Sequence, residues 1–417
     1  MPCEHSRGDP CSACRVVMVK IDEALDLSMK KGGCQLCHGT GFHYGDGLGT
    51  PGKVPKYPCG LCEGAQKPRF PIMLDSGAYS AATLGVEIDL DRYIAFCHKF
   101  RVDYPQAVYV SLDVIGNGKK SHENWRIMRD AGLNPMPVFH PLPRLERKWL
   151  FKYLDETKHV GLGGLVGVPG ALRRSALAQS WELLIGQDRM PIAKVHGMGM
   201  SSVSDLVRYP WHSVDSSSWM RSATFGETIV PKRRGGVWDF TTLPHKIKTD
   251  LRAGWEARDA VRDHINDLSE PERQALYAYL REINIPLGFI AKLKGGGTVI
   301  CKGVRTNLKA RAFAGLEFFA RFTRELRWPR PLAGAKRRPG FFDELREPNP
   351  ERRPVIWRRK DPPCMTYYLS ATVYSAERYV LQHRDRMPHV GVLNNFYNLS
   401  LNAENAANRD LAFLKGR

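Results

Sequence analysis

Short apolar runs that end in a polar residue or a glycine recur between residues 70 and 216. A buried strand is typically an apolar run of about four to eight residues, whereas an amphipathic helix repeats its apolar positions every ~3.6 residues. Each run is followed, after a short connection, by a stretch with helical periodicity. Strands that alternate with helices in this way predict a parallel sheet. The strands are expected near residues 70–74, 107–112, 136–139, 160–166, 192–196 and 212–215.

The helices between these strands are expected near residues 89–100, 123–129, 145–154, 171–185 and 204–207, with Asp89 as the N-cap of the first. In a closed βα barrel the catalytic groups lie at the C-terminal ends of the strands. We therefore expect an α/β fold of the TIM-like (β/α)8 type. The residues at the predicted strand ends are Asp75, Asp113, His140, Gly163, Gly164, Gly197 and Asp215.

Six apparent strands are two short of a full barrel, so the rest must come from later in the chain. The candidates are 228–230, 298–301 and 365–370, and closure by the last would need a rearranged barrel. We expect four regions: a Cys-rich zinc-binding segment at 1–66, the catalytic core at 67–240, a helical region at 241–326, and a basic Pro- and Arg-rich segment with a C-terminal αβ element at 327–417. Helices in the later regions are expected near 251–265, 269–283 and 307–326.

The N-terminal segment carries cysteines at the spacing of metal ligands. Two thiolates three positions apart on a tight turn can bind one tetrahedral Zn2+, and two such turns complete a four-sulfur structural site. This zinc site would use Cys34, Cys37, Cys59 and Cys62, whose CHGTG and CEG surroundings resemble the zinc knuckles of DnaJ-type chaperones locally. A second zinc could use Cys3, His5, Cys11 and Cys14. His38 and His43 are either substitute ligands or solvated loop residues.

The formal net charge of +19 and a pI of about 9.6 indicate a polyanionic partner, and nucleic acid is the usual one. Lys232, Arg233 and Arg234 are the local candidates for phosphate contacts. No apolar run reaches the ~20 residues needed to cross a bilayer. The first residues also lack the apolar stretch of a secretory signal. An intracellular, cytoplasmic protein without a membrane partner is therefore expected.

Asp75 and Asp215 end two predicted strands that lie far apart in the chain. A pair of carboxylates suits glycosyl chemistry, in which one attacks an oxocarbenium-like carbon and the other moves a proton. Burial would raise the pKa of one of them. Strand-end aspartates also cap helices, so the pair alone leaves both interpretations open.

Short segments in a fixed order add a resemblance to the tRNA-guanine transglycosylases. They resemble that family's DSGG, FDE-type, GGLAVG and MGVG motifs and its nucleophile, and the matching residues are Asp75–Gly77, Leu112–Asp113, Gly163–Gly167, His196–Gly199 and Asp215. His140 falls where the family has a pocket glutamine. The similarity covers about residues 70–220, and its specificity lies in the set of motifs rather than in any one of them.

The resemblance implies a role for each matching residue. Asp215 would be the nucleophile and Asp75 the general acid and base, while Asp113 would read the guanine edge. Backbone groups of Gly163 and Gly164 would bind the exocyclic oxygen. The remaining expected substrate-binding residues are Ser76, Gly77, His140, His196 and Gly197. Tyr79 and Trp219 are either stacking aromatics or ordinary core and rim residues.

Departures from the family point to a particular branch. No cysteine cluster follows Asp215, the cysteines precede the predicted barrel, and DSGAYS stands in place of DSGGFQ. This arrangement is more similar to the bacteriophage relatives that exchange guanine for a 7-deazaguanine, such as 7-cyano-7-deazaguanine, in DNA. Three further functions stay open: the same exchange on tRNA or another RNA, a hydrolytic glycosylase, and a non-catalytic zinc-knuckle protein that binds nucleic acid.

Overall fold

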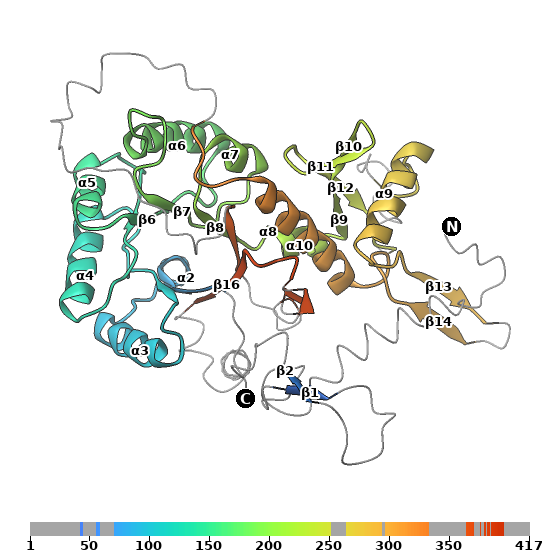
Figure 1. Cartoon of the computed structure of the whole chain (residues 1–417), viewed down its shortest axis with the longest axis horizontal. Coiled ribbons are helices and arrows are strands. Elements are labelled where there is room, and N and C mark those ends of the chain that lie inside the picture. Colours follow the sequence, from blue (N-terminus) through green and yellow to red (C-terminus); the bar gives the residue numbers. More distant parts are fainter. Residues whose placement is uncertain are drawn as a thin grey trace.

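The computed structural model describes residues 42–44, 56–58, 71–251, 264–293, 297–332, 364–370 and most of 376–395. Its centre is an eight-stranded parallel sheet (Figure 1). The strands, in their order across the sheet, are β4 (Val108–Tyr109), β3 (Ile72–Asp75), β16 (Val390–Asn395), β15 (Thr366–Leu369), β8 (Ser213–Ser216), β7 (Lys194–Gly197), β6 (His159–Leu162) and β5 (Val138–Phe139). The six strands expected from the apolar runs are all present.

The two edge strands of this sheet approach each other as the sheet curls. The backbone N–H of Met136, just before β5, donates to the carbonyl of Tyr109 in β4 at 2.7 Å, and the N–H of Ser111 donates to the carbonyl of Met136 at 2.9 Å. Val110 and Met136 thus form a parallel bridge between the two edges. An α/β sheet of eight parallel strands curled in this way is consistent with the predicted TIM-like barrel.

The last two strands come from the C-terminal part of the chain. β15 pairs with β8 and with β16, and β16 pairs with β3. The candidate segments 228–230 and 298–301 lie instead in two-stranded antiparallel sheets outside the large sheet. Closure also needs no rearrangement, because the strands follow one another around the sheet in chain order and a long insertion simply separates β8 from β15.

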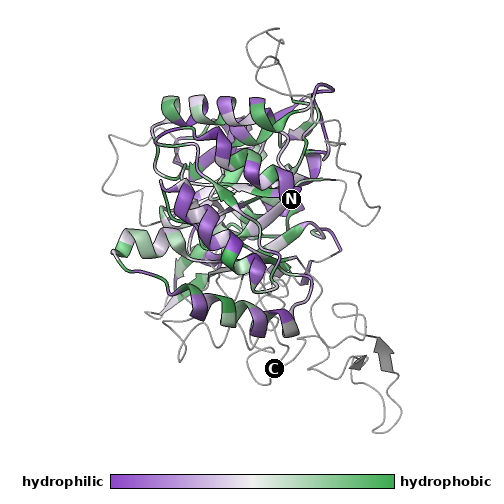
Figure 2. Cartoon of the chain, turned by 90° about the vertical axis from the view of Figure 1, so that its left-hand side faces the viewer, coloured by the Kyte–Doolittle hydropathy of each residue, from purple (hydrophilic) through white to green (hydrophobic). Residues whose placement is uncertain are grey.

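Helices cover the outside of the sheet. Asp89 caps α3 as expected, because its carboxylate accepts the backbone N–H of Arg92 at 2.8 Å. Figure 2 shows hydrophilic and hydrophobic positions alternating along the outer helices, as expected for helices that bury one face. The helices are α2 (Ala78–Leu84), α3 (Leu90–Asp103), α4 (Gly118–Asp130), α5 (Arg147–Glu156), α6 (Gly170–Leu184) and α7 (Val203–Arg208).

The insertion after β8 mixes helices with short antiparallel strands. Its helices α9 and α10 agree with the predicted helices at 269–283 and 307–326, and α9 begins with the expected capping box of Ser269 and Glu272. The expected helix at 251–265 lies mostly outside the described residues. The insertion contains α8 (Ser218–Thr224), β9 (Glu227–Val230), β10 (Lys232–Arg234), β11 (Val237–Asp239), β12 (His245–Lys248), α9 (Glu270–Glu282), β13 (Phe289–Lys292), β14 (Thr298–Cys301) and α10 (Leu308–Glu325). The region from 241 to 326 therefore contains strands as well as the expected helices.

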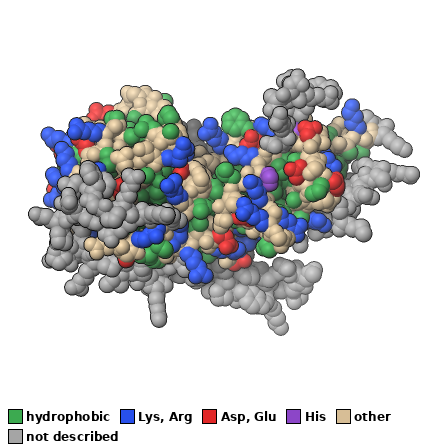
Figure 3. All heavy atoms as spheres, turned by 90° about the horizontal axis from the view of Figure 1, so that it is seen from above, with side chains coloured by type: hydrophobic (Ala, Val, Ile, Leu, Met, Phe, Trp, Pro, Cys, Tyr) green, Lys and Arg blue, Asp and Glu red, His purple; other side chains and the backbone are tan. Residues whose placement is uncertain are grey.

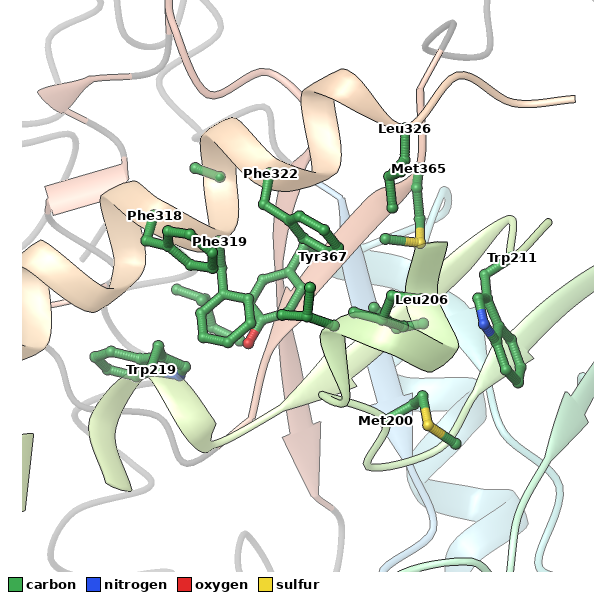
Figure 4. Close-up of a cluster of buried hydrophobic side chains, with 14 of the residues drawn as sticks. Met200, Leu206, Trp211, Trp219, Phe318, Phe319, Phe322, Leu326, Met365 and Tyr367 are labelled. Atoms are coloured by element: carbon green, nitrogen blue, oxygen red, sulfur yellow. The ribbon is translucent and has the colours of Figure 1, made fainter. Parts of the chain in front are cut away.

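Helix α10 joins the insertion to the large sheet. Figure 4 shows its aromatic side chains facing Tyr367 of β15. The ring of Phe319 stacks on Tyr367 with 5.2 Å between ring centroids. Trp219 of α8 lies in the same buried cluster, and its indole N–H donates to the carbonyl of Ser370 at 3.3 Å. Trp219 is therefore a core residue rather than a stacking platform.

A short antiparallel pair, β1 (Phe42–Tyr44) with β2 (Lys56–Pro58), lies in sequence between the two C-x2-C motifs. All eight predicted zinc ligands, from Cys3 to Cys62, lie outside the described residues. Lys and Arg side chains are spread over the face seen in Figure 3. In the described part of the chain, no helix combines the length and the apolar character needed to span a membrane.

Candidate functional site

Alternation along the strands decides which side chains enter the interior of the curled sheet. In β3, Ile72 and Leu74 pack outward in a cluster with Tyr93 of α3, whereas Met73 packs inward with Tyr368. Side chains two residues apart share a face of a strand. Asp75 therefore lies on the same interior side as Met73, at the C-terminal end of the strand.

The same alternation places the other candidate side chains. Val195 and Val214 belong to the outer core, so His196 in β7 and Asp215 in β8 lie on the interior side. His140 follows the inward-facing Val138 by two residues. Because the strands are parallel, these strand ends meet at one rim of the sheet.

Asp215 is held through one of its two carboxylate oxygens. The backbone N–H of Gly199 donates to Oδ1 at 2.7 Å, and Nε2 of His196 lies 3.3 Å from the same atom. Gly199 has a positive φ of 64°, a conformation that glycine adopts without strain. Both of these contacts fall on Oδ1.

His196 is fully buried behind Asp215 rather than at the rim. Its Nδ1 lies 2.9 Å from Oγ of Ser213, and its ring meets that of Tyr368 edge to face at 5.9 Å between centroids. These contacts fix the imidazole orientation. The expected substrate-binding residue His196 is thus placed to orient the carboxylate of Asp215.

Asp113 and His140 form a second buried pair. Nε2 of His140 lies 2.9 Å from Oδ2 of Asp113, and their side chains are 4% (His140) and 9% (Asp113) exposed. A buried carboxylate needs such a partner, because desolvation without one is costly. The pair presents a carboxylate of fixed orientation beside the β5 strand end.

The pKa of Asp75 is affected by its burial and by the two neighbouring carboxylates, Asp113 and Asp215. Its pKa is raised from 3.8 to about 7, chiefly by burial and then by the negative charges of Asp113 and Asp215. The backbone N–H groups of Gly77 and Ser76 act against this rise. A carboxyl group with a pKa near 7 can both donate and accept a proton at neutral pH.

Gly163 and Gly164 pack closely against the His140 ring of the second pair. A Cβ atom at Gly163 would lie 2.7 Å from Val138 and 3.1 Å from the His140 ring, and Gly164 has a positive φ of 69°. The Gly163 N–H donates to the carbonyl of Phe139 at 3.0 Å. The Gly163 amide is thus used by the sheet.

Other expected residues take different places. Gly197 lies against Trp211 of the outer core, where a Cβ atom would come within 3.0 Å of the indole. Ser76 is buried, and its Oγ accepts the N–H of Ala78 at 3.3 Å, as in a turn. Gly77 provides the left-handed turn before α2, with a φ of 86°. Tyr79 on α2 is 54% exposed.

The basic residues of β10 are engaged within their own hairpin. Nε of Arg233 donates to the carbonyl of Gly236 at 2.9 Å, and Nε of Arg234 lies 3.0 Å from Asp239. Lys232 begins the same strand and is half-buried. The hairpin lies in the insertion rather than at a strand end of the large sheet.

Gly199 and Ser213 were absent from the residues expected at the site. The signals that could have found them were the second glycine of the HGMG turn and the two-residue spacing of Ser213 from Asp215. No group of three or more metal-ligating side chains occurs among the described residues. Comparison of the chain with family models, curated proteins and solved structures finds no match.

Proposed function

We propose that this protein is a base-exchange transglycosylase that replaces guanine in DNA by a 7-deazaguanine, such as 7-cyano-7-deazaguanine. The observation that carries this proposal is the convergence of three carboxylates, of which Asp75 has a pKa near 7 while Asp215 is anchored through Oδ1. One carboxylate can then transfer protons while another attacks carbon. The motif order of the tRNA-guanine transglycosylases supports the same assignment.

In the first step Oδ2 of Asp215 attacks C1′ of the target nucleotide. The bond from C1′ to N9 breaks, and its electron pair leaves with the guanine. Protonated Asp75 gives its proton to the departing purine, so guanine leaves neutral and Asp75 becomes a carboxylate. The product is a covalent glycosyl ester on Asp215, in which the ester replaces the glycosidic bond.

In the second step the incoming deazaguanine attacks C1′ through its N9. Ionised Asp75 accepts the N9 proton, the ester bond breaks, and Asp215 is released as a carboxylate. Two displacements at C1′ retain the configuration of the sugar. The protons lost and gained by Asp75 balance over the cycle, so a pKa close to neutral serves both steps.

In the proposed reaction, the pair of Asp113 and His140 recognises the base. Asp113 would accept hydrogen bonds from the N1–H and the amino group of a guanine-like edge, with His140 holding its carboxylate. The amide of Gly164 would donate to the exocyclic oxygen. The nucleotide must leave the base stack to reach these groups, at a cost of roughly a few kcal/mol, which phosphate contacts would offset.

Label exchange tests this proposal. Purified protein is incubated with duplex DNA that contains labelled guanine, with and without 7-cyano-7-deazaguanine, for the wild type, Asp215→Ala and the exposed control Asp91→Asn. We expect repeated turnover of label release, beyond one guanine per protein molecule, to need both the deazaguanine and Asp215 and to survive in the control. Repeated turnover without the incoming base would indicate a hydrolytic glycosylase.

An RNA substrate or a purely binding role would each give a different pattern in the same assay. Exchange on tRNA but not on DNA would assign the chemistry to RNA. Binding of both nucleic acids without exchange, unchanged in Asp215→Ala, would favour the non-catalytic binding protein. Whether the protein exchanges bases or only binds nucleic acid, the zinc would have a structural role. Treatment with a chelator would test whether the predicted N-terminal ligands hold the metal.

A further inference from the structure

Three consecutive helices begin at the rim that carries the carboxylates. Helix α4 follows the strand that ends near Asp113, α5 follows the strand that ends before His140, and α6 follows the strand that ends before Gly163. In alternating βα units the N-terminus of each helix lies at the C-terminal side of the strand before it. The first turns of α4, α5 and α6 therefore face the same side as the site.

The first turns of these helices and their approaches are basic. No acidic residue occurs in the first turn of α4, α5 or α6, and the acidic N-cap residue of α5, Glu146, accepts the indole N–H of Trp149 at 2.7 Å. The basic residues there are Lys119, Lys120, Arg144, Arg147, Lys148, Arg173 and Arg174. A helix N-terminus carries a partial positive charge, so acidic side chains are favoured there and basic ones disfavoured.

Three other helices of the same protein follow the usual preference, whereas the first turns of α2, α8 and α10 have no acidic residue. The first turns of α3, α7 and α9 contain acidic residues, such as Asp91, Asp205 and Glu270. Helices α5 and α6 also have no basic residue in their last turns, where a positive charge would be favourable. The charges of α5 and α6 are therefore opposite to the usual preference at both ends.

Several of these cations have no acidic partner in the described structure. Lys120, Arg144 and Arg174 are exposed and form no described ion pair, and exposed Lys148 lies over the Trp149 ring at 5.0 Å. At the opposite end of α4, Arg126 is paired with Glu156 at 2.8 Å. The rim thus has uncompensated positive charge, while the far end of the same helix is neutralised.

We propose that Lys120, Arg144, Lys148 and Arg174, here called the basic arc, bind the phosphates of the DNA strand next to the exchanged nucleotide. Adjacent helices lie about 8–10 Å apart, so an arc over three helices spans roughly 16–20 Å. A DNA strand has one phosphate per about 3.4 Å of helix axis, so such an arc faces several phosphates. The anionic backbone would also satisfy the positive helix N-termini. This inference rests on the proposed function for the position of the exchanged nucleotide.

Salt-dependent binding tests the basic arc. The full chain carrying Lys120→Gln, Lys148→Gln and Arg174→Gln is compared with the wild type and with a control of equal charge change, Lys99→Gln, Arg208→Gln and Arg281→Gln. The control residues are exposed and lie away from the first turns of α4, α5 and α6. Affinity for duplex DNA is measured without any incoming base over a series of salt concentrations.

The arc variant is expected to bind roughly tenfold or more weakly at low salt, with the slope of log K against log salt reduced by about 2.7 for three lost phosphate contacts. The control variant should keep nearly the wild-type slope. Equal slopes for the arc variant and the control would overturn the inference. Circular dichroism of both variants checks that each is folded.

Because this measurement needs no catalysis, it separates the two proposals. A reduced slope in an arc variant of a protein that exchanges no base would support the arc while the proposed function fails. Normal base exchange with an unchanged slope would support the proposed function and contradict the arc.

Discussion

The protonation of Asp75 depends on its burial and on two neighbouring carboxylates. Burial and the charges of Asp113 and Asp215 hold its pKa at about 7, well above the ordinary 3.8. The sequence indicated that burial would raise the pKa of one of the two strand-end carboxylates, Asp75 or Asp215, but not which of them. The raised pKa of Asp75 depends on two other strand ends that only the folded sheet brings near.

The substitution Asp75→Asn should lower the activity of the protein and raise its stability at neutral and higher pH. Base exchange should fall by roughly 10²–10⁴-fold, because proton transfer is lost. A folded-state pKa above the unfolded value stabilises the protein fully below about pH 4, and this contribution is lost as the pH rises toward 7. The variant should therefore match the wild type at pH 4 and exceed it by roughly 4 kcal/mol in free energy of unfolding at pH 8. Urea unfolding at both pH values checks this, and equal pH dependence in both proteins would contradict it.

His196 should act through Asp215. His196→Leu removes a hydrogen bond to a charged group, which is worth about 1.5–3 kcal/mol and corresponds to roughly a 10–100-fold loss of kcat. His196→Gln keeps an N–H donor and should recover part of the rate. Single-turnover rates with saturating DNA measure the effect. A change in KM alone would show that His196 binds substrate instead of orienting the nucleophile.

At the scale of elements, the apolar runs were sufficient to locate β3 to β8 and most of the helices around them. The pairing of Oδ1 of Asp215 with His196 and Gly199 was not predictable, because it depends on the register of β7 against β8 and on the turn after β7. The strands β12 and β13 were missed, because two-stranded hairpins with one exposed face have a weak apolar pattern. The strand at 298–301 was expected, but it pairs with β13 and not with the large sheet.

Gly163 should tolerate no side chain between β5 and β6. In Gly163→Ala the new methyl would meet Val138 at 2.7 Å and the His140 ring at 3.1 Å, which should displace the partner of Asp113. Overpacking of this kind costs about 1–3 kcal/mol, and binding of the deazaguanine should weaken as well. Gly170→Ala in the first turn of α6 is the matched control, because its Cβ would meet only the flexible Arg174 side chain. Thermal unfolding and base-binding titrations of both variants measure the difference, and equal behaviour would contradict this packing effect.

At the scale of the whole molecule, the sheet is completed by two strands that follow a long insertion. The alternation of strand and helix predicted the α/β class, but it could not rank the segment at 365–370 above two other apolar runs. The local pattern of apolar residues does not show which strands pair with each other. β15 lies between β8 and β16, and its Tyr367 packs against Phe319 of α10. The predicted zinc sites remain predictions from cysteine spacing.

Closure by β16 should be sensitive to the size of one residue. A Cβ atom at Gly391 would lie 2.4 Å from the carbonyl oxygen of Pro71 and 2.8 Å from the Tyr368 ring. Gly391→Ala should therefore force β16 away from β3 and lower the free energy of unfolding by about 1–3 kcal/mol or more. Denaturant unfolding measures the loss, and a stability equal to the wild type would argue against β16 as an inner strand of the sheet.

The most direct test of the proposed transglycosylase is a search for the covalent intermediate. The protein is mixed with guanine-containing duplex DNA without an incoming base, quenched with acid, and analysed by intact mass and peptide mapping. Attack by Asp215 on C1′ predicts a DNA adduct on this residue, absent from Asp215→Ala, that 7-cyano-7-deazaguanine converts to modified DNA. Guanine release without an adduct, or an adduct that persists in Asp215→Ala, would contradict it.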